Sequence, residues 1–170
     1  PGIGGHCIPL DPYYLANKAR ELDFHTRFIE LASDINEHMP YHVIERIMDA
    51  LNSAGKSLKG AKVLVLGVAY KKDIEDIRES PALKLLELLC AKETDVSFND
   101  PYINEVKLTH VALTSTELSS KILSAADCVV IATDHSCYDI KDIAAQAKLV
   151  FDTRGVTTEI RSENIHRLGE

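Results

Sequence analysis

The fold is decided by the stretch Lys62-Val63-Leu64-Val65-Leu66-Gly67, a short run rich in valine and leucine that is closed by glycine. A run of this length and composition predicts a buried strand. Residues 128–132 repeat the pattern, and Ser80-Pro81 between the two runs is a typical helix start. Strands separated by helix-length segments indicate a parallel sheet with right-handed crossovers. We therefore predict an α/β fold in which residues 61–170 form a Rossmann-like domain.

The rest of this domain continues the alternation. We expect one sheet with strands at residues 62–66, 96–98, 109–113, 128–132 and 149–151. Helices are expected at residues 81–90, 117–123 and 140–147. Ligands bind outside the carboxyl ends of the strands in such sheets. The predicted ligand edge therefore unites four segments, residues 67–79, 99–102, 133–138 and 152–155.

Residues 1–60 have the pattern of a separate helical region. A short helix is predicted over residues 11–22 and a long one over about 26–52, ending near Gly55, which suits a left-handed C′ position. Pro40 lies inside the long helix, so we expect either a kink near Met39 or two helices. The apolar stripe of this helix either packs against another subunit or a further domain, or belongs to an ordinary core helix.

The candidate chemistry begins in the glycine-rich stretch Gly4-Gly5-His6-Cys7, which is followed four residues later by Asp11. Glycine lets the backbone approach a ligand closely, so the stretch is predicted to be a loop that presents a thiol. Asp11 precedes Pro12, and this pair is equally typical of a helix N-cap and N1. His6 is not expected to act as the base for Cys7, because adjacent side chains usually diverge.

The loop at residues 67–79 is the second candidate region, because it is long for a connection between a strand and a helix. It holds Lys71, Lys72 and Arg78, and it lacks the Gly-x-Gly-x-x-Gly pattern of a dinucleotide site. Cationic side chains could hold a nucleotide here. The alternative is a solvated loop whose charges pair with one another, which we favour for Lys72.

Four ordered motifs carry a family resemblance. They are Gly4-Gly5-His6-Cys7-Ile8-Pro9-Leu10-Asp11-Pro12, Asp34-Ile35-Asn36, the segment from Gly67-Val68-Ala69-Tyr70-Lys71-Lys72-Asp73 to Arg78-Glu79-Ser80-Pro81, and Asp152-Thr153-Arg154-Gly155. Together they resemble the UDP-glucose/GDP-mannose (nucleotide-sugar 6-) dehydrogenases over essentially the whole chain. The motifs His-Cys-Ile-Pro and Arg-Glu-Ser-Pro are most similar to those of the UDP-N-acetylhexosamine 6-dehydrogenases. The alternative, with a different substrate, is a UDP-glucose 6-dehydrogenase.

This resemblance implies a mechanism centred on Cys7. The family oxidises the sugar C6 alcohol twice, first to an aldehyde held as a cysteine thiohemiacetal and then to a thioester that water hydrolyses, with two NAD reduced. Asp11 would assist the water, and Gly4 and Gly5 would line the substrate. One departure is Leu10, since UDP-glucose dehydrogenases carry lysine there, so a cofactor contact of that lysine is lost or moved.

The resemblance also assigns the cations. Tyr70, Lys71 and Arg154 would bind the UDP-sugar, and Arg78 would reach the NAD phosphates. Family members begin with an NAD-binding domain whose fingerprint is absent from these 170 residues. We therefore expect residues 1–60 to be the catalytic-cysteine and central-helix region, and residues 61–170 the UDP-sugar-binding domain, of a longer enzyme. The isolated piece is expected to be inactive, and the family's central helix implies a homodimer.

Composition limits the possible partners. The net charge is −7 with charges of both signs interspersed, which argues against nucleic acid and anionic membranes. No apolar run has the length of a membrane span. Cys7, Cys90, Cys128 and Cys137 form no paired motif, which indicates a reducing, cytoplasmic setting. The segment Asp134-His135-Ser136-Cys137 has no second pair of ligands, so no metal site is expected.

Two function classes compete with this interpretation. In the first, the chain is a non-catalytic nucleotide-binding or assembly module and Cys7 is a buried thiol, as we expect for Cys90 and Cys128. In the second, it is a thiol-dependent dehydrogenase of free aldehydes. Experiments can distinguish these two classes from the nucleotide-sugar dehydrogenase. A reactive Cys7 that substrate protects would exclude the non-catalytic module, and activity that requires a UDP group would exclude the aldehyde dehydrogenase.

Overall fold

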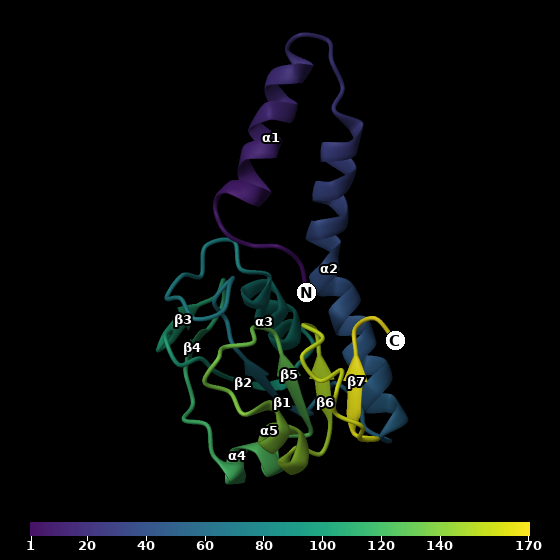
Figure 1. Ribbon diagram of the computed structural model, residues 1–170, viewed down its shortest axis with the longest axis vertical. Coiled ribbons are helices and arrows are strands. Elements are labelled where there is room, and N and C mark those ends of the chain that lie inside the picture. The colour runs from purple at the N-terminus through teal and green to yellow at the C-terminus, as the bar shows by residue number, and fades with distance from the viewer.

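A helical hairpin rises from an α/β domain in the computed structural model, which describes residues 1–170 (Figure 1). The hairpin consists of α1 (Cys7–Arg20) and α2 (Arg27–Ser53). The end of α2 follows the prediction, since Gly55 adopts a φ of +74° and the Lys56 N–H donates to the Leu51 carbonyl at 2.9 Å. These are the features of a Schellman motif, which satisfies the last carbonyls of a helix.

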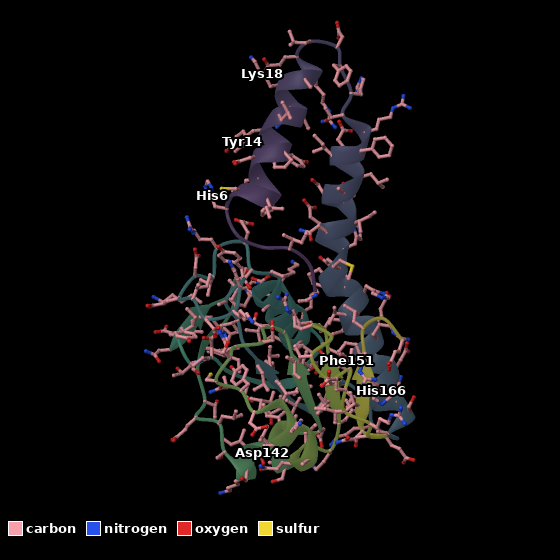
Figure 2. All side chains as sticks on the ribbon, in the orientation of Figure 1. His6, Tyr14, Lys18, Asp142, Phe151 and His166 are labelled. Atoms are coloured by element: carbon pink, nitrogen blue, oxygen red, sulfur yellow. The ribbon has the colours of Figure 1, made fainter.

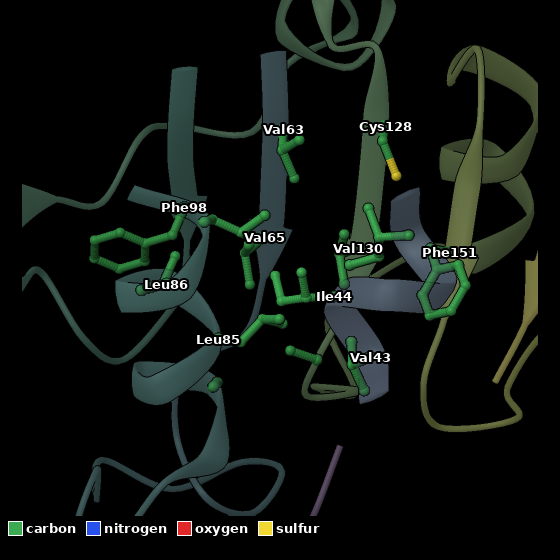
Figure 3. Close-up of a cluster of buried hydrophobic side chains, with 14 of the residues drawn as sticks. Val43, Ile44, Val63, Val65, Leu85, Leu86, Phe98, Cys128, Val130 and Phe151 are labelled. Atoms are coloured by element: carbon green, nitrogen blue, oxygen red, sulfur yellow. The ribbon is translucent and has the colours of Figure 1, made fainter. Parts of the chain in front are cut away.

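Helix α2 continues through Pro40, so the alternative of two separate helices is wrong. Proline lacks an N–H group, and one intrahelical hydrogen bond is therefore missing at this point. From Pro40 onward one face of α2 is buried, at Pro40, Val43, Ile44, Ile47, Ala50 and Leu51. This half packs on α3 (Pro81–Ala91) and joins the main apolar core (Figure 3).

The central sheet has five parallel strands in the order β2-β1-β5-β6-β7. They are β1 (Lys62–Leu66), β2 (Asp95–Asn99), β5 (Cys128–Ile131), β6 (Val150–Asp152) and β7 (Ile165–Arg167). Side chains alternate between two apolar clusters. Val63 and Val65 join the cluster with α2 and α3, whereas Leu64 and Leu66 join the cluster with α4 (Ser120–Ala125) and α5 (Ile140–Gln146). The Rossmann-like α/β prediction is confirmed.

The membership of the sheet differs from the prediction at two strands. The segment expected at residues 109–113 forms β4 (Ala112–Thr114), which pairs antiparallel with β3 (Glu105–Lys107) in a separate two-stranded sheet. The fifth strand is β7, whose sequence Ile165-His166-Arg167 has no apolar run to signal a strand. β7 lies at the edge of the sheet and only Ile165 of its three side chains is buried, so the strand carries no apolar run. None of the helices combines the length and the apolar composition needed to cross a bilayer.

Candidate active site

Cys7 is the first residue of α1 and its thiol is exposed. The predicted N-cap role of Asp11 is wrong, because the helix begins four residues earlier, with His6 as its N-cap (Figure 2). Asp11 lies one turn after Cys7 on the same face of α1. Both residues border a shallow hollow between α1 and α2 that is otherwise lined by Ile8, Pro12, Leu15 and Ile29. The structure therefore brings the thiol and the carboxylate together.

The loop before Cys7 is pressed against the connection from β1 to α3. A Cβ atom on Gly4 would lie 2.5 Å from the Glu79 carbonyl oxygen, and one on Gly5 would lie 2.8 Å from the Tyr70 ring. Gly5 also has a φ of +91° and donates its N–H to the Arg78 carbonyl at 3.0 Å. Only glycine permits this close approach. The two glycines thus fix the start of α1 beside Tyr70 and Arg78.

The four segments predicted to share one edge of the sheet are joined there by hydrogen bonds. The buried Asp100 carboxylate accepts the N–H groups of Val68 and Ala69 at 2.7 and 3.2 Å. His135 Nε2 lies 3.1 Å from the same carboxylate, and its Nδ1 accepts the Asp73 N–H at 2.9 Å. Because Nδ1 accepts a hydrogen bond, Nε2 carries the ring proton and donates it to Asp100.

Asp100 and His135 were not predicted as site residues. His135 is 2% exposed and lies between the rings of Tyr102 and Tyr138, at centroid distances of 5.1 and 5.6 Å. Both of its nitrogens are engaged, so the histidine shapes the loop instead of binding a ligand itself. The only available signal was that Asp100 and His135 follow two predicted strands that end at the same edge.

The cations of the edge differ in their partners. The guanidinium of Arg78 forms an ion pair of 2.7 Å with Asp76, as the alternative of charges pairing within the loop had anticipated. The hydrogen bond to Asp76 raises the pKa of Arg78, and Tyr70 and Cys7 add smaller contributions in the same direction. Lys71 is exposed and forms no ion pair. Lys72 is solvated as expected, but the charge pairing favoured for it is wrong, because it forms no ion pair either. Lys71 is therefore available to an anionic ligand.

Arg154 follows β6 and forms an ion pair of 3.1 Å with Asp134. Its backbone is fixed by buried Asp152, which accepts the N–H groups of Arg154 and Gly155 at 2.8 Å each. Asp152 therefore has a structural role in this loop. The hollow at Cys7 contains neither Arg154 nor Lys71.

The cysteines divide into two groups. Cys128 is fully buried, and burial raises the pKa of its thiol. Burial also raises the pKa of Cys90, which is partly covered on α3. Cys7 and Cys137 are exposed. Since a reactive cysteine must be accessible and able to ionise, only Cys7 and Cys137 meet the first requirement.

Comparison with known proteins places both parts of the chain. Residues 64–159 match the family described as "UDP-glucose/GDP-mannose dehydrogenase family, UDP binding domain", and residues 1–38 match the central domain of the same family. Leu66, Tyr70, Asp100, His135 and Arg154 therefore all lie within the segment that matches the UDP binding domain.

Individual relatives agree with this assignment. The chain is 33% identical to a UDP-N-acetyl-D-mannosamine dehydrogenase of Methanococcus vannielii over 92% of its length, which is 36% of that protein. It is 32% identical to an NDP-N-acetyl-D-galactosaminuronic acid dehydrogenase of Ralstonia nicotianae over the same shares. The structure of a UDP-D-ManNAc dehydrogenase from Pyrococcus horikoshii superposes with a TM-score of 0.83 at 32% identity, covering 99% of this chain and 39% of the other. The chain belongs to the UDP-glucose/GDP-mannose dehydrogenase family.

Proposed function

We propose that this chain is the catalytic-cysteine region and the UDP-binding domain of an NAD-dependent UDP-N-acetylhexosamine 6-dehydrogenase. The observation that carries the proposal is the contact between Gly5 and Arg78, 3.0 Å from N–H to carbonyl oxygen. It holds the exposed thiol of Cys7 next to the loop that belongs to the UDP binding domain. Two N-acetylhexosamine-type relatives support the sugar class.

Cys7 is the proposed nucleophile. Its thiolate adds to the C6 aldehyde of the sugar and forms a thiohemiacetal. Loss of a hydride from C6 and of the hydroxyl proton converts this intermediate to a thioester. Water then attacks the thioester carbon, with Asp11 accepting a proton, and the carboxylate leaves as the thiolate of Cys7 is restored. The position of Asp11 one turn from Cys7, on the rim of the same hollow, supports this role.

The diphosphate and the sugar are proposed to bind along the edge of the sheet. Lys71 offers an unpaired ammonium group and Arg154 a guanidinium, which is suited to bidentate contact with phosphate oxygens. Arg154 would exchange Asp134 for the phosphate. Tyr70, which packs on Gly5, together with the backbone of Gly4 and Gly5, would border the sugar beside the thiol.

The residues of this chain fit a contact to NAD at one point. The side chain of Arg78 is 64% exposed, and its backbone carbonyl accepts the N–H of Gly5, two residues before Cys7. A guanidinium in this position suits a phosphate of the dinucleotide. NAD supplies the acceptor for the hydride from C6 in each of the two oxidations. We propose that it is held mainly by an N-terminal domain that precedes residues 1–60 in the full-length enzyme.

We further propose a homodimer formed through α2, acting in the cytoplasm in polysaccharide biosynthesis. The first half of α2 presents three large apolar side chains to solvent, and they are 52–87% exposed: Phe28, Leu31 and Ile35. Apolar surface of this kind is typical of an interface. The four cysteines are free thiols, which is consistent with a reducing compartment.

The test uses NADH formation by the full-length enzyme with UDP-N-acetylhexosamines as substrates. Cys7→Ser should lower kcat by at least about 10³-fold, because serine is a much weaker nucleophile. Cys137→Ser is the matched control, since this thiol is also exposed, and it should keep activity. Iodoacetamide should label Cys7 first, and UDP-sugar should protect it.

Other outcomes identify the competing functions. Full activity of Cys7→Ser would exclude covalent catalysis by Cys7, and absence of any turnover or protection would favour a non-catalytic nucleotide-binding module. Oxidation of free aldehydes without a UDP group would indicate an aldehyde dehydrogenase. The 170-residue chain alone should form no NADH, and activity from it would show that the N-terminal domain is dispensable.

A further inference from the structure

Asn36 of α2 is bonded to the loop that leads to Cys7. The Ile3 N–H donates to Asn36 Oδ1 at 2.7 Å, and Asn36 Nδ2 donates to the Ile3 carbonyl at 3.0 Å. The carboxamide therefore satisfies both backbone groups of one residue, as a neighbouring strand would. Two hydrogen bonds from one planar group fix the direction of the chain as well as its distance from α2.

The backbone of Asn36 takes part in the same contact. Pro40 has no N–H group, so the Asn36 carbonyl lacks its usual donor four residues later in the helix. Gly2 packs at this place with a φ of +124°, and a Cβ atom on it would lie 3.3 Å from Asn36 Oδ1 and 3.4 Å from the Asn36 carbonyl oxygen. The proline inside α2 thus coincides with the point where the loop rests on the helix.

The loop has two anchors, one on each side of Gly4. Asn36 holds Ile3, and the Arg78 carbonyl holds Gly5. Cys7 follows the second anchor by two residues and begins α1. Asn36 itself lies one turn before the buried half of α2, which belongs to the rigid core. The first anchor therefore fixes the position of the loop relative to the core of the domain.

We propose that Asn36 is a positioning residue that holds the Cys7 thiol in register with the nucleotide-binding edge of the sheet. The inference rests on the proposed function of Cys7. The side chain of Asn36 forms hydrogen bonds to Ile3 alone, and none to the thiol or to a residue assigned to the substrate. It acts through the backbone of Ile3, and losing it frees the loop to shift relative to Tyr70 and Arg78. Misplacement of a reacting group by about 1 Å can cost about 10²-fold in rate.

The test compares two variants and a control in the full-length enzyme. Asn36→Ala removes both hydrogen bonds, and Asn36→Asp keeps the acceptor for the Ile3 N–H but turns an oxygen toward the Ile3 carbonyl. Both should lower kcat by about 10- to 100-fold, while KM for the UDP-sugar and the Kd for UDP change by less than about threefold. Asn52→Ala is the control, because Asn52 is an exposed asparagine on the same helix and its side chain makes no hydrogen bond.

The comparison of kcat with KM distinguishes positioning from general stabilisation. If Asn36 only stabilised the fold, its loss would lower the amount of folded enzyme but leave the kinetic constants of the folded fraction unchanged. A kcat within about twofold of wild type in Asn36→Ala would overturn the proposal. If Asn36→Ala does not fold, wild-type kcat in Asn36→Asp would overturn it equally. Full activity of Cys7→Ser would instead overturn the proposed function, so the two failures are distinguishable.

Discussion

The two halves of α2 share one amphipathic pattern but have opposite environments. Ile47 and Leu51 in the second half are 0% and 1% exposed, because α3 and the central sheet cover them. Phe28 and Ile35 in the first half are 87% and 56% exposed. The apolar stripe of a helix therefore predicts which face is to be covered, but what covers it depends on the remainder of the fold.

The neighbour of the first half explains its exposure. Helix α1 is the only element beside it (Figure 1), and α1 itself buries a single residue, Ala16. A pair of helices with so little shared core contributes little to stability. The alternative of an ordinary core helix is therefore confirmed for the second half. Packing of the first half against another subunit or a further domain stays a prediction.

Truncation of one side chain in each half provides the strongest test of this contrast. Ile47→Ala should lower the free energy of unfolding by about 2–5 kcal/mol, because it removes buried methyl groups and leaves a cavity. Phe28→Ala, the truncation in the first half, should change it by less than about 0.5 kcal/mol when the chain is diluted to the monomer, because any cost at the proposed dimer interface is then absent. Urea denaturation of the chain followed by circular dichroism measures both. Equal losses would mean that the hairpin is part of the cooperative core.

The elements with long or repeated apolar patterns could be predicted from sequence. The strands β1 and β5, helix α3 from Ser80-Pro81 and the end of α2 at Gly55 were all anticipated within a few residues. Each has a local cause, either an apolar run or a residue with restricted backbone preferences. Strands β3 and β7 have only three residues each and no apolar run, so they give no clear local signal. The sequence also does not indicate that β4 pairs with its neighbour β3 instead of joining the main sheet.

The candidate site shows the same division. The sequence predicted that the four loop segments meet at one edge of the sheet. The hydrogen bonds of Asp100 and His135 join three of them, and the bond from Arg154 to Asp134 joins the fourth. The carboxamide bridge from Asn36 to Ile3 joins residues 33 positions apart in the chain and could not be predicted. The roles proposed for Cys7, Asp11, Lys71, Arg78 and Arg154 stay predictions.

A substitution at Asp100 tests how much the hydrogen bonds at the edge of the sheet contribute to the stability of the domain. All groups facing its carboxylate are donors, namely the N–H groups of Val68, Ala69, Tyr102 and Ile103 and His135 Nε2. Asp100→Asn would turn an NH₂ group toward one of these donors. We expect a loss of about 1–3 kcal/mol at pH 7, the cost of an unsatisfied buried polar group.

The same residue predicts a dependence on pH. Burial alone would raise the pKa of Asp100, but the hydrogen bonds from His135 and from backbone N–H groups outweigh burial, and the pKa is below its usual value. The stabilisation is therefore present above the unfolded pKa of about 4 and is lost as the pH falls through the lower folded pKa. Urea titrations from about pH 5 to pH 2 should show a steeper loss for the wild type than for Asp100→Asn. Parallel slopes would contradict this assignment.

The smallest effect is expected at the joint between α2 and the domain. Gly55 has a φ of +74° with open space around the position of a Cβ atom, so Gly55→Ala introduces backbone strain without a steric clash. This strain should lower the free energy of unfolding by about 1 kcal/mol, because non-glycine residues adopt the left-handed region at that cost. Gly169→Ala is the control, since Gly169 also has open space but no positive φ, and it should be neutral or slightly stabilising. If Gly55→Ala were neutral as well, the end of α2 would be free to adjust, and the rigid part of the helix would have to end before the Schellman motif.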